Sequence, residues 1–347
     1  MKIGNYNISR NSRPIIIAEM SGNHNKSLER ALKIVELVAK SGAHILKLQT
    51  YTADTLTIQS NKDDFVIKDK NSLWSGRTLY DLYNDAHTPW DWHPKIMKRA
   101  NELGLLCFST PFDETAVDFL EDLNVPAYKI SSFENVHLPL IRKVAKTGKP
   151  IIISIGLASE KEIEEAVATL KENNCENFAL LKCTSSYPAD PKDSNILTIP
   201  DLRKKFNCEV GLSDHTTGIG CALAAISNGA SIIEKHITLD KKDGGVDSSF
   251  SIQPEELKLL VSESENAWKS LGKIFYGPTK TEENILDYRS SIYFVEDLNE
   301  NEIITSKNIK IIRPGRGLKP KFFNELIGRK VKQKITKGTP VSWEFLS

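Results

Sequence analysis

Two histidines, His215 and His236, carry the clearest chemical potential in this sequence, because each stands at the end of a short apolar run. The two runs are consecutive along the chain, and neighbouring strands of a sheet lie roughly 4.8 Å apart, so the imidazoles can converge on one ion. Two neutral nitrogen ligands leave other positions to water and substrate. This suits a divalent first-row ion such as manganese rather than a closed structural zinc site. The alternative is that each histidine only forms hydrogen bonds in the core or at its rim.

Lysines and hydroxyl residues end several other apolar runs. The set comprises Lys47, Lys129, Lys182, Thr110, Ser132, Ser154 and Ser213. Positive charge in a low-dielectric cavity is unfavourable unless an anion shares it, so the set suits a small ligand that carries phosphate or carboxylate. Two alternatives stay open. The lysines could simply pair with Glu19, Glu134 and Glu234, or a desolvated lysine could be the nucleophile of a Schiff-base aldolase.

Two carboxylates are further candidates. Glu19 ends the first apolar run. It could be a general acid or base if burial raises its pKa, or a salt-bridge partner of Lys47 or Lys129. Asp247 follows two glycines in an irregular segment, where it either binds a sugar hydroxyl or stabilises a turn.

The elements that must position these residues are eight short runs rich in β-branched residues, most of them followed by apolar residues at helical spacing. They are Ile15–Glu19, Ala43–Thr50, Leu105–Thr110, Ala127–Ser132, Ile151–Ser154, Phe178–Thr184, Glu209–Ser213 and Ser231–His236. Eight such units fit an α/β fold of the (β/α)₈ TIM-barrel type, in which catalytic groups lie at the C-terminal strand ends. A doubly wound sheet is less favoured, because no GxGxxG turn follows the first strand.

The rest of the chain divides by pattern into three parts. Residues 1–272 are the predicted barrel, residues 273–288 a linker, and residues 289–347 a small β-rich domain. Its expected strands lie at 291–295, 310–312 and 331–335. Within the barrel, residues 51–88 form a connection too long for a bare linker and predict a lid over the strand ends. Residues 237–253 form a second irregular connection.

Composition excludes several classes of protein. The 347 residues, 40% hydrophobic and 26% charged, are typical of a folded globular protein. A formal net charge of +1 gives no reason to expect nucleic acid or a membrane as partner. The chain has no apolar run of about 20 residues and no secretory signal, so we expect it in the cytoplasm. Five cysteines without a CxxC pair predict reduced thiols.

Six segments stand in an order that is typical of one enzyme family. They are Ala18–Asn25, Lys47–Thr50, Ser109–Asp113, Ala127–Ser132, Gly211–Thr216 and Ile233–His236. Together they resemble the sialic acid synthase family, transferases that condense phosphoenolpyruvate with an amino-sugar aldehyde and release phosphate by C–O cleavage. The resemblance covers the whole chain. It includes a C-terminal domain similar to type III antifreeze protein, of the SAF or β-clip type, with Ile312–Gly315 at its signature position.

Four segments resemble the pseudaminic acid branch of that family in particular. They are Glu19–Asn25, Ser72–Arg77, Tyr80–Tyr83 and Asp243–Ser251. The implied sugar is 2,4-diacetamido-2,4,6-trideoxy-β-L-altropyranose, reacting as its open-chain aldehyde. The sialic and legionaminic acid branches, with the same chemistry, are the nearest alternatives. A Schiff-base aldolase and a non-catalytic sugar- or ice-binding protein are more distant ones.

The resemblance also implies roles for single residues. His215 and His236 would hold a catalytic divalent ion, manganese in the first place, with magnesium and cobalt as alternatives. The implied phosphoenolpyruvate site comprises Lys47, Thr110, Lys129, Ser132, Ser154 and Ser213. The implied sugar contacts are Gln49, Glu134 and Asp247, and Glu19 would be the catalytic carboxylate. Arg313 would reach the sugar from the small domain of a second subunit in a domain-swapped homodimer. Ser185 stands where sialic acid synthases usually carry an amide.

Overall fold

Eight parallel strands close into a barrel, as the repeated strand–helix pattern predicts. The computed structural model describes residues 1–70 and 72–347. The barrel strands are β3 (Ile15–Glu19), β4 (Ile45–Thr50), β5 (Leu106–Pro111), β6 (Tyr128–Ile130), β7 (Ile151–Ser154), β8 (Phe178–Cys183), β9 (Glu209–Asp214) and β10 (Ile232–His236). Strand β10 pairs with β3 and closes the barrel, so residues of its first and last strands become neighbours. A hairpin of β1 (Lys2–Ile3) and β2 (Tyr6–Asn7) precedes it.

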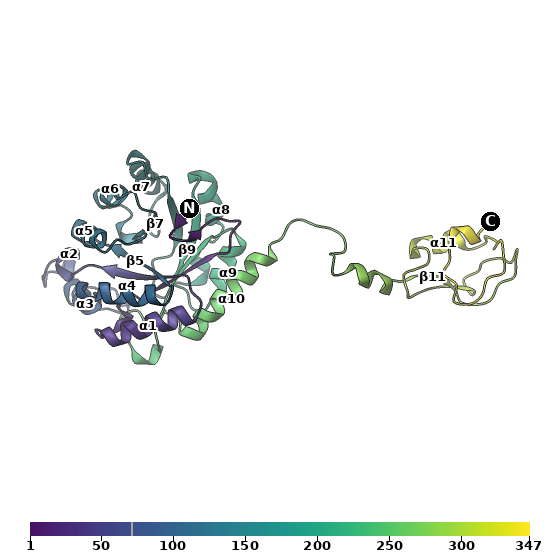
Figure 1. The fold of residues 1–347 in the computed structure, drawn as a ribbon, viewed down its shortest axis with the longest axis horizontal. Helices are drawn as coiled ribbons and strands as arrows, with labels where there is room; N and C mark the ends of the chain where they lie inside the picture. Colours follow the sequence, from purple (N-terminus) through teal and green to yellow (C-terminus); the bar gives the residue numbers. More distant parts are fainter. Residues whose placement is uncertain (71) are drawn as a thin grey trace. The chain divides into compact units, whose positions relative to one another are not determined.

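Helices surround the barrel (Figure 1). They are α1 (Leu28–Lys40), α4 (His93–Glu102), α5 (Glu114–Asp122), α6 (Leu138–Ala145), α7 (Glu160–Glu172), α8 (Thr198–Phe206), α9 (Gly220–Ser227) and α10 (Pro254–Ser270). Their starts follow local sequence: Ser159 and Glu162 form a capping box before α7, and Pro254 occupies the first turn of α10. The strands are buried along almost their whole length, which accounts for their β-branched composition.

One strand is shorter than its sequence predicts. The run 127–132 forms only β6, because the chain turns at Ser132 into the short 3₁₀ helix η4 (Ser132–Glu134). The hydroxyl of Ser132 accepts a hydrogen bond from the backbone N–H of Gly156 at 3.1 Å. This contact joins the turn after β6 to the loop after β7. Ser132 therefore lies just beyond the strand end.

The connection 51–88 folds over the strand ends, although its residue 71 lies outside the described residues. It contains α2 (Ala53–Leu56), η2 (Asp63–Phe65) and α3 (Leu79–Ala86), with a single bridge between Val66 and Thr78. The indole N–H of Trp74 donates to the carbonyl of Val246 at 3.0 Å, which ties this connection to the irregular segment before α10. Close packing supports the tie, since a Cβ on Gly22 would lie 2.4 Å from Val246 and 3.1 Å from the carbonyl oxygen of Ala86.

Lys273–Ser347 form a second compact unit, and Met1–Gly272 the first. In the second unit β11 (Ser291–Phe294) pairs antiparallel with β12 (Ile309–Ile312), around a core that includes Ile292, Phe294 and Leu298. Its short helical segments are η7 (Glu283–Tyr288), η8 (Pro320–Phe322), α11 (Phe323–Leu326) and η9 (Trp343–Phe345). In the part of the chain that the structure describes, no helix has the length and apolarity to span a membrane.

The prediction of a third strand at residues 331–335 of the small domain is wrong. Val331 and Ile335 make only isolated bridges, to Leu346 and Leu298. The three residues between them are exposed. A regular strand would turn the polar Gln333 toward the core together with Val331 and Ile335, so only the two apolar ends are anchored.

Candidate active site

A cavity of about 470 Å³ opens at the C-terminal ends of the barrel strands, under the 51–88 connection. Most of the predicted site residues line it. They are Lys47, Gln49, Lys129, Ser132, Glu134, Ser154, Ser213, His215, His236 and Asp247. Glu19 and Thr110 are fully buried behind this wall, where they contact Lys47. Arg313 lies in the second unit. The alternation of side chains along each strand therefore directs the predicted groups into one space.

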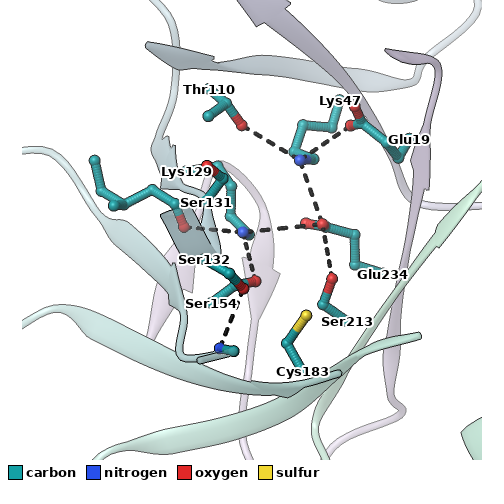
Figure 2. A network of polar contacts seen from close by, with 12 residues as sticks. Glu19, Lys47, Thr110, Lys129, Ser131, Ser132, Ser154, Cys183, Ser213 and Glu234 are labelled. Atoms are coloured by element: carbon teal, nitrogen blue, oxygen red, sulfur yellow. Dashed lines mark hydrogen bonds and ion pairs between the residues drawn. The ribbon is translucent and has the colours of Figure 1, made fainter. Parts of the chain in front are cut away.

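Lys47 is the centre of a buried ion-pair network (Figure 2). Its Nζ lies 3.1 Å from Oε2 of Glu19 and 3.3 Å from Oε1 of Glu234, and it donates to the hydroxyl of Thr110 at 3.3 Å. Burial by itself would lower the pKa of Lys47, but the two carboxylates raise it above its ordinary value. Lys47 is therefore a permanent cation held by two carboxylates.

Lys129 has weaker compensation for its charge. Its Nζ donates to the hydroxyl of Ser154 at 2.6 Å and to the carbonyl of Ile130 at 3.0 Å, while Glu234 lies 3.9 Å away. Burial lowers the pKa of Lys129 to about 8. The hypothesis of simple ion pairing thus describes Lys47 well but Lys129 poorly. A ligand anion beside Lys129 would supply the missing charge.

The carboxyl groups differ in their state. Burial, followed by the repulsion of Glu234, raises the pKa of Glu19, although Lys47 and the amide of Gln49, which donates at 2.9 Å, act against the rise. For Glu234, the attraction of Lys129 and Lys47 outweighs burial and lowers the pKa. Burial also raises the pKa of Glu134 to about 7. The site therefore combines a firmly ionised carboxylate with two that take up a proton more readily.

The two histidines converge as predicted, with ring centroids 5.3 Å apart. Nδ1 of His215 lies 3.0 Å from the carbonyl oxygen of Thr184, so that nitrogen is assigned as the donor. Burial lowers the pKa of His215, but Cys183 and the carbonyl of Thr184 together raise it above its ordinary value. Nδ1 of His236 is buried without a hydrogen-bond partner and lies 4.0 Å from Asp247. Burial and the nearby His215 hold the pKa of His236 well below its usual value, so its imidazole is neutral.

His236 fits a divalent cation, because a neutral imidazole is its usual nitrogen ligand. His215 would offer Nε2 as a second ligand once that nitrogen has lost its proton. Residues 1–70 and 72–347 contain no cluster of three or more His, Cys, Asp or Glu side chains that could hold a metal ion. A cation bound between His215 and His236 would therefore depend on water or substrate for its remaining ligands.

Sequence reasoning misplaced one lysine and missed several aromatic residues. Lys182 does not line the cavity; its Nζ donates to the carbonyl of Cys183 at 2.9 Å, and it is Cys183 that faces inward. Neighbouring residues of a strand face opposite sides, which is the physical reason for the correction. The missed lining residues include Tyr51, Tyr83 and Tyr187. The ring centroid of Tyr187 lies 4.6 Å from that of His215, but Tyr187 stands in a loop, where periodicity gives no signal.

Comparison with known proteins agrees with this geometry. The chain is 42% identical over 341 residues to the pseudaminic acid synthase of Campylobacter jejuni, covering 97% of both chains. It is 40% identical over 331 residues to that of Helicobacter pylori, covering 95% of this chain and 96% of the other. The crystal structure of an N-acetylneuraminic acid (sialic acid) synthetase from Leptospira borgpetersenii superposes with a TM-score of 0.73 at 32% identity, covering 83% of this chain and 95% of that one. Residues 289–347 match the SAF domain. Residues 34–276 match the NeuB family, and the chain belongs to that family.

Proposed function

We propose that the protein is a pseudaminic acid synthase. It condenses phosphoenolpyruvate with 2,4-diacetamido-2,4,6-trideoxy-β-L-altropyranose, as the open-chain aldehyde, and releases phosphate. The observation that carries this proposal is the single cavity in which two buried lysines adjoin two converging imidazoles. The identity to synthases of this name, which is higher than to the sialic acid synthetase, favours the pseudaminic branch.

Phosphoenolpyruvate fits the lysine side of the cavity. Its phosphate and carboxylate need cations and hydroxyl donors, and the one carboxylate paired with Lys129 among the described residues, that of Glu234, lies 3.9 Å away and is shared with Lys47. The hydroxyl side chains at hand are Ser132, Ser154, Ser213 and, beside Lys47, Thr110. Buried charge-assisted hydrogen bonds of this kind bind and orient an anion strongly.

The sugar fits the part of the cavity that the 51–88 connection lines. Gln49, Glu134 and Asp247 offer polar contacts in the same cavity. The lining also contains apolar side chains, namely Leu56, Ile67, Leu79, Leu82 and Phe112. Such a wall suits the methyl groups of a trideoxy sugar with two acetamido groups better than a fully hydroxylated sugar, because each buried hydroxyl needs its own hydrogen-bond partner.

The residues explain the steps of the condensation. Lys47 and Lys129 hold the donor while its C3 forms the new C–C bond to the aldehyde carbon. C2 gains cationic character that the nearby carboxylate of Glu234 stabilises, water adds at C2, and the C–O bond to phosphate breaks. The aldehyde oxygen gains a proton as the C–C bond forms, and the water loses one as it adds at C2. Glu19, whose pKa is raised by burial, is the group proposed to carry this proton. A divalent ion held by His215 and His236 would, when bound, polarise the aldehyde oxygen.

The decisive experiment is a phosphate-release assay with phosphoenolpyruvate and a panel of aldoses, with and without a chelator. We expect turnover of the trideoxy-altrose only, lost on chelation and restored by manganese. Turnover of N-acetylmannosamine but not of the trideoxy sugar would assign the chain to the sialic branch. A borohydride-trapped adduct of pyruvate on a lysine would show an aldolase instead.

We also propose that the active form is a homodimer in which Arg313 enters the partner's site. Four apolar side chains on the loops after β6, β7 and β8 are exposed, which is unfavourable for an isolated barrel. Their exposed fractions are 59% for Phe133, 53% for Val136, 72% for Leu157 and 78% for Leu197. Mixing the variants His215→Ala and Arg313→Ala tests the exchange. Re-associated dimers should regain roughly a quarter of wild-type activity, because half the dimers are mixed and each mixed dimer has one intact site. No recovery would contradict the exchange.

A further inference from the structure

A buried ion pair lies directly beside both histidines, on the outer side of the barrel wall. Lys235 precedes His236 in β10, and Asp214 precedes His215 at the end of β9. The two residues are register partners in neighbouring strands, and their side chains are 0% and 1% exposed. Neither lines the cavity, because strand alternation turns Lys235 away from the inward-facing Glu234 and His236.

The pair closes a complete set of hydrogen bonds. Nζ of Lys235 donates to Oδ2 of Asp214 at 2.7 Å and to the carbonyl oxygen of Thr216 at 2.6 Å. The other carboxylate oxygen of Asp214, Oδ1, accepts from the backbone N–H of Thr216 at 2.9 Å and from its hydroxyl at 2.7 Å. We call Lys235, Asp214 and Thr216 the clasp. The two bonds between Thr216 and Asp214 span His215, and Lys235 donates to both of these residues.

The clasp therefore fixes the backbone on both sides of His215 and ties it to the residue next to His236. The ring of His215 is held in addition through Nδ1 at the carbonyl of Thr184. A buried ion pair is weak evidence for stability, since apolar side chains of similar volume are often as stable in its place. The pair does hold the backbone of β9 and β10 in one relative position, because moving either charge away from its buried partners would be strongly unfavourable.

We infer that Lys235 and Asp214 are positioning residues, which set the relative placement of the two imidazoles for binding a divalent cation. The inference rests on the proposed function, since that function supplies the cation. It predicts that weakening the clasp lowers cation affinity before it lowers the stability of the barrel. Groups that orient metal ligands in this indirect way typically contribute about 10- to 100-fold to metal affinity.

The test uses the full-length protein and Mn²⁺ alone, with free Mn²⁺ measured by its electron paramagnetic resonance signal. Lys235→Met leaves the Asp214 carboxylate buried without its cation, so this variant could fail to fold. The double variant Lys235→Met/Asp214→Asn removes both charges and keeps an acceptor for Thr216. We expect it to melt near the wild-type temperature and to bind Mn²⁺ at least about tenfold more weakly.

A matched control lies at the other end of the same strand. Arg203 pairs with Glu209, the first residue of β9, at 2.8 Å, far along the strand from the histidines. Arg203→Met should lower the melting temperature and leave Mn²⁺ affinity unchanged. Wild-type Mn²⁺ affinity in the folded double variant, or an equal loss in Arg203→Met, would overturn the positioning role while leaving the proposed function intact. A wild-type protein that binds no Mn²⁺ would overturn the positioning role before any variant is made, while the phosphate-release assay decides the proposed function separately.

Discussion

Lys47 and Lys129 carry the same charge in the same cavity, yet replacing each with methionine should change stability in opposite directions. Lys47→Met removes the cation that lies 3.1 Å from Glu19 and 3.3 Å from Glu234. Two buried carboxylates would then share only Lys129, which lies 3.9 Å from Glu234, as a counterion. Removing one partner of a buried ion pair typically costs about 3–5 kcal/mol, so we expect the free energy of unfolding to fall by that amount.

Lys129→Met removes a cation that the fold holds at a cost. The lowering of its pKa from 10.5 to about 8 means that keeping the buried ammonium charged costs about 3 kcal/mol at neutral pH. Because the folded-state pKa is the lower one, this cost is complete below pH 8 and fades as the pH rises toward 10.5. At pH 7 the methionine variant should therefore be as stable as the wild type or more stable, by up to about 3 kcal/mol.

Urea unfolding at pH 7, followed by circular dichroism, measures both changes, and phosphate release measures the KM for phosphoenolpyruvate. Both variants should raise that KM at least about tenfold, since each removes a charge-assisted contact to the anion. Lys182→Met is the matched control, because Lys182 lies on a barrel strand but does not line the cavity. This variant should keep the wild-type KM for phosphoenolpyruvate. An equal loss of stability in both cavity variants would mean that Glu234 stabilises the charge of Lys129 as well as that of Lys47. That result would refute the predicted difference between the two lysines.

Three further predictions concern the metal ligands, the lid and pH. His215→Ala should abolish phosphate release while the circular dichroism spectrum stays native; residual turnover within tenfold of wild type would exclude a ligand role. Trp74→Phe removes the hydrogen bond to Val246, worth about 1 kcal/mol, so the KM for the sugar should rise about fivefold while that for phosphoenolpyruvate stays constant. Burial lowers the pKa of three histidines to about 4, namely His24, His44 and His93. These histidines take up protons in the unfolded chain below about pH 6.5 but stay neutral in the folded protein. Each of the three should therefore lower the free energy of unfolding by about 2 kcal/mol between pH 7 and 5. A free energy of unfolding, measured with urea, that stays constant over this range would contradict the prediction.

The barrel and half of the site follow from local sequence. Strand alternation alone directs Lys47, Gln49, Ser213 and Glu234 inward, because a strand buried on both faces leaves each side chain only two directions. The same alternation places Lys182 outside the barrel interior and its neighbour Cys183 inside, because β8 alternates like the other strands. A lysine near a strand end is therefore a site residue only where the strand turns it inward.

The rest of the site depends on tertiary packing that no local pattern encodes. Tyr187 and Trp74 come from connections far apart in sequence, and their ring centroids lie 5.9 Å apart. Trp74 is held by a carbonyl of a third connection, that of Val246. A loop conformation is fixed by such contacts between loops rather than by periodicity, so only the presence of a lid could be predicted, not which of its side chains line the cavity.

The distribution of unsatisfied polar atoms shows what kind of site this is. Among the described residues, two buried side-chain atoms without a hydrogen-bond partner belong to the strand ends: Oε2 of Glu234 and Nδ1 of His236. Each such atom costs about 1–3 kcal/mol, a cost that a protein selected only for stability or for passive sugar binding has no reason to retain beside two lysines. An enol phosphate satisfies the lysines but cannot donate to a carboxylate. The remaining acceptors need a donor or a cation, which water, the hydroxyl and acetamido groups of a sugar, or a metal ion would supply. The arrangement thus calls for an anionic and a donor-bearing ligand together, which is the requirement of a condensation and not of a single-ligand binder.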